Sequence, residues 1–121
     1  MRMDADFDIR PDPRHNMIRV RMAGFFDQDH VRHFAAAYRS ALAGLTAPGH
    51  LTLVDIKAMK IQAQDIVTAF SALLAAPDVR SHKLAFLCGS TLARLQAQRL
   101  TDRDGVRFFD DPVSAERWLL D

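Results

Sequence analysis

The sequence predicts an α/β domain built on a mostly parallel five-stranded sheet, with an N-terminal antiparallel hairpin and four helices. Three observations predict it. Two N-terminal segments alternate apolar and charged residues, later apolar runs lack that alternation, and segments of helical periodicity separate these runs. The resulting order is β-β-α-β-α-β-α-β-α, with helices long enough to connect parallel strands. A chain of 121 residues, of which 49% are apolar, suits a single domain over residues 1–121.

The first two strands are expected to form a hairpin. Apolar and charged residues alternate over residues 6–10 and again over residues 17–22, which is the period of a half-buried strand. Pro11 and Pro13 lie between these segments, and neither can donate a hydrogen bond to a sheet. Two short strands around a proline-rich turn therefore predict an antiparallel pair.

A first helix is expected after Asp27, because aspartate is a good N-terminal cap. Asp29 follows in the first turn, where the helix dipole favours an anion. Gly44 and the Pro48-Gly49 pair are expected to end this helix. The apolar residues that recur at helical spacing are Val31, Phe34, Ala35, Tyr38, Leu42 and Leu45.

Residues 51–56 form a nearly continuous apolar run, which is typical of a parallel strand covered on both faces. Residues 57–60 are then expected to form a loop. A second helix follows and ends before Pro77, since proline cannot continue a helix. The apolar stripe of this helix consists of Ile66, Val67, Phe70, Leu73 and Leu74.

Residues 84–88 and 106–109 are predicted to be the last two strands. Residues 89–91 turn the first of these strands into a third helix. Asp111 as a cap and Pro112 at the first helical position predict a final helix. The third helix carries three leucines, which are Leu92, Leu95 and Leu100.

Three stretches carry a resemblance that goes beyond the order of elements. They are residues 53–56, residues 60–65, and the tail 106–111 with Ala115 and Trp118-Leu119. The first looks like the central strand of STAS domains, the anti-sigma-factor-antagonist fold. The second falls where those domains carry an Asp-Ser loop. The tail looks like the ending of the bacterial SpoIIAA-like branch of this superfamily, which is related in fold to STAS domains and discussed beside lipid-binding Sec14-type domains.

The resemblance implies a regulatory, protein-binding role. Classical antagonists of this fold are switched by phosphorylation of a serine in the loop after the central strand. This chain has Gln62, Ala63 and Gln64 there, with no hydroxyl group to modify. Without an acceptor, the change of charge that drives such a switch cannot occur at this place. We therefore expect an interaction module that is not switched by phosphorylation.

The charge of the chain argues against nucleic acid as a partner. Its 16 basic and 15 acidic residues give a formal net charge of +1, and their signs alternate along the chain. DNA, RNA and anionic membranes instead bind best to a protein face on which basic residues are concentrated. Arginine, aspartate and alanine dominate over lysine and glutamate, which indicates a GC-rich bacterial genome. Homodimerisation is compatible with the sequence.

The expected location is the cytoplasm, without stable membrane insertion. Cys88 is the sole cysteine, so no intrachain disulfide can form and an oxidising compartment is not required. No window approaches the roughly 18 apolar residues of a membrane span. The first six residues turn acidic where a signal peptide would become apolar.

Cys88 and Ser90 lie where a strand is expected to meet a helix N-terminus, a place that can acidify a thiol and hold an anion. Nucleophilic catalysis also needs a general base within reach, and the sequence places none there. The favoured interpretation is that Cys88 is a small core residue and that Ser90 helps to cap the helix. We expect no catalytic residue and no enzyme activity.

His30 and His33 are three residues apart on the first predicted helix, so one face could present both imidazoles to a metal. A protein metal site needs further ligands at diagnostic spacing, and these are missing. A glycine-rich phosphate loop is missing as well. The sequence therefore predicts neither a metal nor a cofactor.

The best place for a site is the carboxyl edge of the sheet, where ligands of open α/β sheets usually bind. Large apolar residues in predicted loops there either close the core, line a ligand cavity or face a partner. The first hypothesis is a protein contact at this edge and the second helix. The alternative is a carrier or sensor of a small apolar, lipid-like ligand. The candidate partner- or ligand-binding residues are Phe25, Phe26, Lys57, Met59, Lys60, Ile61, Gln62, Gln64, Cys88 and Ser90.

Overall fold

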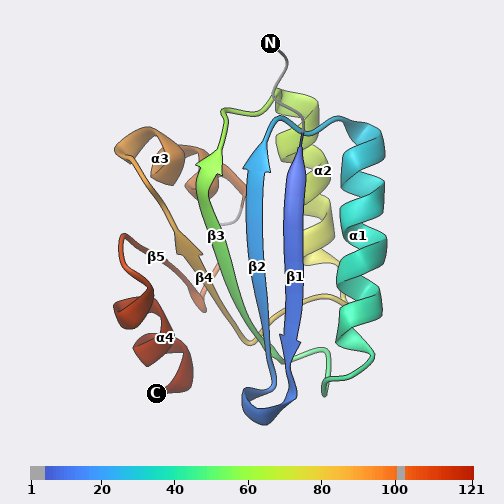
Figure 1. The fold of residues 1–121 in the computed structure, drawn as a ribbon, viewed down its shortest axis with the longest axis vertical. Coiled ribbons are helices and arrows are strands. Elements are labelled where there is room, and N and C mark those ends of the chain that lie inside the picture. The colour runs from blue at the N-terminus through green and yellow to red at the C-terminus, as the bar shows by residue number, and fades with distance from the viewer. Residues whose placement is uncertain (1–4, 101–102) are drawn as a thin grey trace.

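A computed structural model describes residues 5–100 and 103–121, with Leu100 described by its backbone alone. It confirms the predicted order of strands and helices (Figure 1). A single turn of 3-10 helix, Pro13–His15, is added between the first two strands. The elements are β1 (Asp6–Asp12), β2 (Met17–Gly24), α1 (Gln28–Leu42), β3 (Leu51–Met59), α2 (Gln64–Ala75), β4 (Lys83–Leu87), α3 (Thr91–Leu100), β5 (Val106–Phe109) and α4 (Pro112–Leu120).

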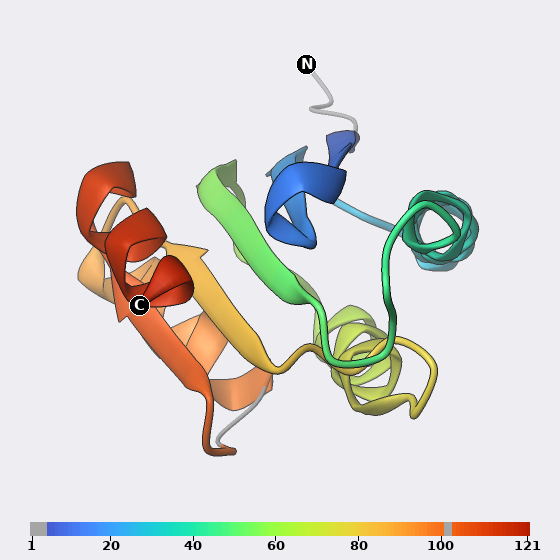
Figure 2. The same ribbon diagram turned by 90° about the horizontal axis from the view of Figure 1, so that it is seen from below.

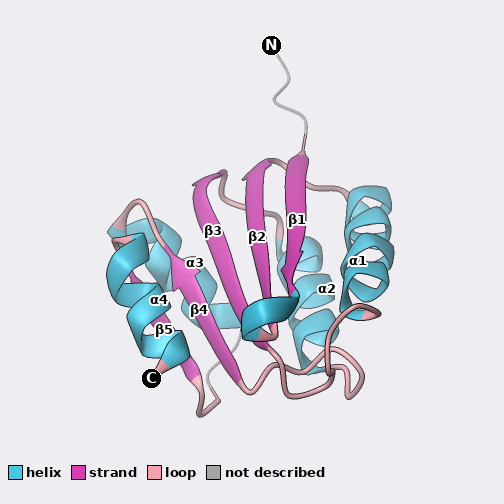
Figure 3. Cartoon of the chain, turned by 60° about the horizontal axis from the view of Figure 1, so that its bottom comes forward, coloured by secondary structure: helices cyan, strands magenta, loops and turns pink. Residues whose placement is uncertain are grey.

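The five strands form one sheet in which spatial order equals chain order, β1-β2-β3-β4-β5 (Figure 3). β1 and β2 pair antiparallel, and every later neighbour is parallel. β3 is longer than predicted. The structure corrects the expected loop at residues 57–60, because Ala58 and Met59 still pair with Ala23 and Gly24 of β2 after a shift in register.

The order of the strands explains where the helices lie. Parallel strands that follow one another in one direction, joined by right-handed crossovers, place all connecting helices on one face. Accordingly, α1, α2 and α3 cover one face of the sheet and α4 alone covers the other (Figure 2). α4 packs on β3, β4 and β5, so the charged face of β1 and β2 stays open on that side.

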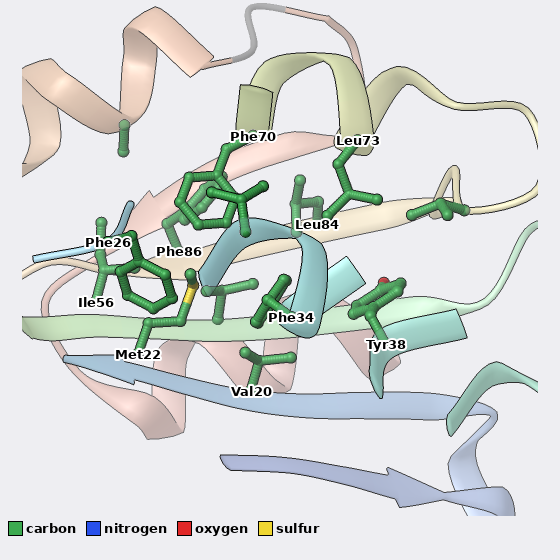
Figure 4. Packing of buried hydrophobic residues seen from close by; sticks show 14 of the residues in the cluster. Val20, Met22, Phe26, Phe34, Tyr38, Ile56, Phe70, Leu73, Leu84 and Phe86 are labelled. Atoms are coloured by element: carbon green, nitrogen blue, oxygen red, sulfur yellow. The ribbon is translucent and has the colours of Figure 1, made fainter. Parts of the chain in front are cut away.

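The larger core lies between the sheet and the three connecting helices (Figure 4). Phe34 from α1 and Phe70 from α2 meet edge to face with ring centroids 5.7 Å apart. Each fully buried side chain of this kind stabilises the fold by about 1.5–3 kcal/mol. The smaller core, under α4, contains Met17, Leu53, Ala85, Leu87, Ala115 and Leu119.

Two of the predicted helix caps are present. The Asp27 carboxylate accepts a 2.8 Å hydrogen bond from the backbone NH of His30, and Asp111 does the same for Ser114. In contrast, the N-cap residue of α2 is Ala63, whose side chain has no hydrogen-bond acceptor. The Asp111 bond lowers the pKa of that carboxyl group, because it stabilises the anion.

Ion pairs cross the face of the sheet that α4 leaves open. Arg21 of β2 pairs with Asp6 of β1 at 2.7 Å. Arg19 contacts Glu116 of α4 at 2.6 Å and Asp12 at 3.2 Å. The Glu116 contact raises the pKa of Arg19. Arg19 thus ties α4 to the N-terminal hairpin at the border between the covered and open halves of the sheet.

Candidate binding surface at the carboxyl edge

The carboxyl ends of β2, β3, β4 and β5 lie along one border of the sheet, the carboxyl edge (Figure 1). Two edge loops matter most, residues 25–27 before α1 and residues 60–63 before α2. They are 36 residues apart in the sequence, yet the backbone NH of Phe26 donates to the Gln62 side chain. The candidate residues of both loops are therefore neighbours in space.

Gln62 joins these loops. Its side-chain oxygen accepts a 2.8 Å hydrogen bond from the backbone NH of Phe26. Its side-chain amide donates to the carbonyl of Gly24 at 2.9 Å and to that of Lys60 at 2.5 Å. The side chain is only 8% exposed, so these bonds satisfy polar groups that water cannot reach.

The third helix is fastened to the same point. The backbone NH of Gln62 donates to the side-chain oxygen of Gln96 at 3.3 Å. One turn further along α3, Arg99 donates to the side-chain oxygen of Gln64 at 2.9 Å. The loop before α2 is therefore held from β2, from the start of α1 and from α3.

The large apolar residues predicted in loops at this edge differ in exposure. They are Phe25, Phe26, Met59 and Ile61. Phe26 is 6% exposed and packs on Phe70, with ring centroids 5.3 Å apart, so it closes the core. Met59 is half-buried and lines an interior cavity. Phe25 is 50% exposed and Ile61 is 49% exposed. Two large apolar side chains therefore face solvent on adjacent, pinned loops.

Lys57, Lys60, Gln64 and Ser90 are all exposed, as a contact surface requires. The amine of Lys57 lies 3.8 Å from the Asp55 carboxylate. Ser90 has a structural role as well, because its hydroxyl accepts a 3.1 Å bond from the backbone NH of Ala93 at the start of α3. These four residues add exposed polar and charged groups to the carboxyl edge and to the start of the helices that follow it.

Two candidate residues lie inside the protein instead. Gln62 is buried by its own hydrogen bonds, so it shapes the surface from beneath and cannot touch a partner directly. Cys88 is buried in the larger core. Burial raises the pKa of its thiol, which keeps it protonated and a poor nucleophile. The structure therefore moves both residues from the expected contact surface into the interior.

An open hollow lies beside the edge loops, and the sequence analysis did not anticipate it. It has a volume of about 500 Å³ and lies between the N-terminal ends of α1 and α2. Asp27, Asp29 and Asp65 line it together with the buried ring of Phe26. The Gln28 side chain donates to the Asp65 carboxylate at 3.2 Å and bridges the two helices. The hollow is therefore acidic, whereas Lys57 and Lys60 are exposed at the end of β3 and just after it.

α3 presents further apolar side chains. Leu92 and Leu95 of the predicted helix stripe are exposed, and the side chain of Leu100 lies outside the described residues. The helix packs on the sheet through Ala97 and Ala93, whose small side chains let it approach closely. The signal in the sequence was the spacing of the two alanines, at positions i and i+4 on one face.

A largely apolar cavity lies in the larger core and is partly open to solvent. It has a volume of about 40 Å³ and lies between the sheet, α2 and α3. Met22, Val54 and Phe86 line it from the strands, while Phe70 and Ala97 line it from the helices. At about 24 cal/mol per Å³, an empty space of this size forgoes roughly 1 kcal/mol of packing.

A buried polar cluster lies at the opposite end of the sheet. The Tyr38 hydroxyl is 3.0 Å from Nε2 of His50 and 2.8 Å from the Thr52 hydroxyl, which is 2.6 Å from Ser81 Oγ. Burial lowers the pKa of His50 and raises that of Tyr38. Nδ1 of His50 is buried without a hydrogen-bond partner among the described residues. The His50 ring and the Thr52 hydroxyl are buried, while Ser81 also lines an open hollow of about 450 Å³ together with Pro48, Gly49 and His82.

Among the residues that the structure describes, no group of three or more His, Cys, Asp or Glu side chains could hold a metal ion. Among the helices so described, none has the length and apolar character needed to cross a membrane.

The structure is similar to two solved structures over nearly its whole length. The first is an uncharacterized protein of the DUF3478 family with a SpoIIAA-like fold, from Shewanella loihica PV-4. It aligns with a TM-score of 0.72 over 97% of this chain and 94% of the other, at 19% sequence identity. This chain has the SpoIIAA-like fold. No family model and no curated protein matches the sequence.

The second similar structure is an anti-sigma factor antagonist from Mycobacterium paratuberculosis. It aligns with a TM-score of 0.63 over 98% of this chain and 96% of the other, at 10% identity. At these identities the SpoIIAA-like fold is what the chains share. In this SpoIIAA-like chain, residues 61–63 before α2 and Gln64 at its first position contain no hydroxyl group.

Proposed function

We propose that this chain is a non-catalytic, cytoplasmic protein-interaction module of the SpoIIAA-like type, and that it contacts its partner at the carboxyl edge. The observation that carries the proposal is the exposure of Phe25 and Ile61 on loops that Gln62 holds in place. Large apolar side chains that are half exposed on a fixed surface are typical of binding sites. Lys57, Lys60 and Gln64 supply the polar surroundings that such interfaces have.

The similarity to an anti-sigma factor antagonist supports an interaction role for the fold. The missing hydroxyl group supports a contact that is not switched by phosphorylation in this loop. The acidic hollow that Phe26 lines and the exposed Lys57 and Lys60 favour a partner surface that carries both signs of charge.

The test compares two double variants with charges added at different places. Phe25→Asp with Ile61→Asp changes the carboxyl edge. The matched control, Val113→Asp with Leu120→Asp, changes two exposed apolar residues of α4 instead. All four positions are exposed, so each change should alter the free energy of unfolding by no more than about 0.5 kcal/mol.

Partners recovered from bacterial lysate with the unchanged protein are identified by mass spectrometry, purified and titrated by calorimetry. The edge variant should weaken binding at least about 100-fold, whereas the α4 variant should retain it. If both double variants bind as tightly as the unchanged protein, the carboxyl edge is not the contact surface.

A second copy of this chain is one partner that the same surface could bind. Sedimentation velocity then shows association that rises with concentration, and the edge variant alone remains a monomer. A monomer at all concentrations, together with a recovered partner, assigns the surface to a different protein.

A further inference from the structure

The cavity in the larger core is independent of the exposed edge and has its own chemistry. Its lining contains no Asp, Glu, Lys, Arg or His side chain among the described residues. Figure 4 shows Met22, Phe34 and Phe70 converging from the sheet and two helices on the same interior. A charged molecule would lose its hydration there without gaining a counter-ion. The lining therefore favours the binding of neutral, apolar molecules.

The lining also contains polar side chains, and most of them already have hydrogen-bond partners within the protein. At the deep end, the hydroxyls of Tyr38 and Thr52 bond to each other and to His50 and Ser81. At the other end, the Gln62 side chain is engaged by backbone groups. Both sets are satisfied within the protein.

Gln96 is the exception. Its side-chain oxygen accepts the bond from Gln62, while its side-chain NH₂ group donates to no group among the described residues. Gln96 is half-buried, as are Met59 at the end of β3 and Leu74 near the end of α2, whereas the other lining residues are buried. A hydrogen-bond acceptor on a bound molecule would find its donor here.

The size of the cavity can adapt. As it stands, about 40 Å³ accommodates roughly three water-sized groups, but an apolar cavity holds water poorly. Two of its walls, Met22 and Met59, are unbranched thioethers that change rotamer readily to fit a ligand.

We propose that this cavity binds a small neutral molecule with an apolar body and a single hydrogen-bond acceptor, which enters beside Met59 and Gln96 and accepts a hydrogen bond from the Gln96 amide. The proposal does not depend on the partner surface described above.

Three probes of similar shape test the chemistry: cyclopentanone, cyclopentane and the cyclopentylammonium ion. Each is titrated into the ¹⁵N-labelled protein, and binding is followed by the amide shifts of residues that line the cavity. Cyclopentanone should bind saturably. Cyclopentane should also bind saturably, because it keeps the apolar body, but it cannot accept a hydrogen bond from Gln96. The ammonium ion should give no saturable shift. Equal shifts by all three probes, or none by cyclopentanone, overturn the proposal.

Variants locate the site. Ala97→Leu fills the cavity from α3 and should abolish cyclopentanone binding. Gln98→Leu adds the same side chain at an exposed position of the same helix and should leave binding unchanged. If Ala97→Leu does not fold, the test uses Val67→Ile in its place. This variant adds one methylene group to the cavity lining from α2. Binding that survives a folded cavity-filling variant places the probe elsewhere and contradicts the proposal.

Gln96→Leu tests the donor. It should weaken cyclopentanone binding about 2- to 10-fold and leave cyclopentane binding nearly unchanged. An equal effect on both probes, or none on cyclopentanone, shows that Gln96 does not hold the acceptor.

Discussion

The side-chain oxygen of Gln62 accepts a 2.8 Å hydrogen bond from the backbone NH of Phe26, which joins the loop before α2 to the loop before α1. The same side chain donates to the backbone carbonyls of Gly24 and Lys60. One buried amide group thereby satisfies three backbone groups, and it sets the positions of Phe25 and Ile61 on either side of it. Removal of the Gln62 side chain should therefore destabilise both loops of the carboxyl edge.

We predict that Gln62→Ala lowers the free energy of unfolding by about 1–3 kcal/mol, because buried backbone groups lose their partners. Gln62→Glu should also be destabilising, since a carboxylate can accept from Phe26 but cannot donate to the carbonyls of Gly24 and Lys60. Urea unfolding measures both. Gln64→Ala is the control, because Gln64 is exposed, and it should stay within about 0.5 kcal/mol of the unchanged protein. Similar losses at both positions would contradict a special role for Gln62.

The second prediction concerns His50 and pH. Burial lowers the pKa of His50 in the folded protein below its usual 6.5. Between these two pKa values the unfolded chain binds a proton that the folded chain does not. The free energy of unfolding therefore stays level above about pH 6.5 and decreases as the pH falls toward the folded-state pKa.

Urea unfolding at about pH 7.5 and about pH 5 measures this decrease, and His50→Gln should reduce it. The carboxyl groups of Asp12, Asp78 and Asp111 have pKa values below 3.8, so their contributions are lost only at lower pH. An equal decrease in the unchanged protein and in His50→Gln would assign the effect to other groups.

The third prediction is that Cys88 reacts slowly with Ellman's reagent in the folded protein. The thiol is buried, so the reagent cannot reach it easily. Its pKa is also raised, so little of the reactive thiolate is present. Reaction should become rapid in urea. The double variant Cys88→Ala, Ser90→Cys is the comparison, because position 90 is exposed, and it should react rapidly without denaturant. Rapid labelling of native Cys88 would mean that this part of the core opens readily.

The fourth prediction concerns the uncapped start of α2. Ala63 has φ −63° and ψ 154°, the extended conformation that N-cap residues adopt, but it offers no side-chain acceptor. Ala63→Ser should supply one and raise the free energy of unfolding by about 1 kcal/mol. Ala63→Val, which has no oxygen, should give no gain. Thermal unfolding of both variants measures the difference, and a gain in both would show that capping is not the cause.

Local patterns predicted most of the fold because each strand and helix obeys its own period. Alternation over residues 6–10 marked β1, and Asp27 and Asp111 marked helix starts that the structure confirms. The end of β3 was missed, since Met59 belongs to the strand through pairing with Gly24 of β2. That pairing follows a shift in register, which is a property of two strands and not of one sequence segment.

The sequence placed the candidate residues at the carboxyl edge, but it did not predict which of them are exposed. Phe25 and Phe26 are adjacent and alike, yet one faces solvent and the other packs on Phe70 of α2. Gln62 looks like a surface residue in a loop, and only the meeting of two distant loops buries it. Leu92 and Leu95 stay exposed because α3 packs through Ala97. Each difference depends on which element lies opposite, and the sequence alone does not give that.

The agreement between spatial order and chain order in the sheet has a consequence for synthesis of the protein on the ribosome. Because each strand neighbours the one made just before it, β2 can join β1, and β3 can join β2, while later residues are still untranslated. No gap inside the sheet has to be held open for a strand that emerges afterwards. The growing chain always extends the sheet at its newest border.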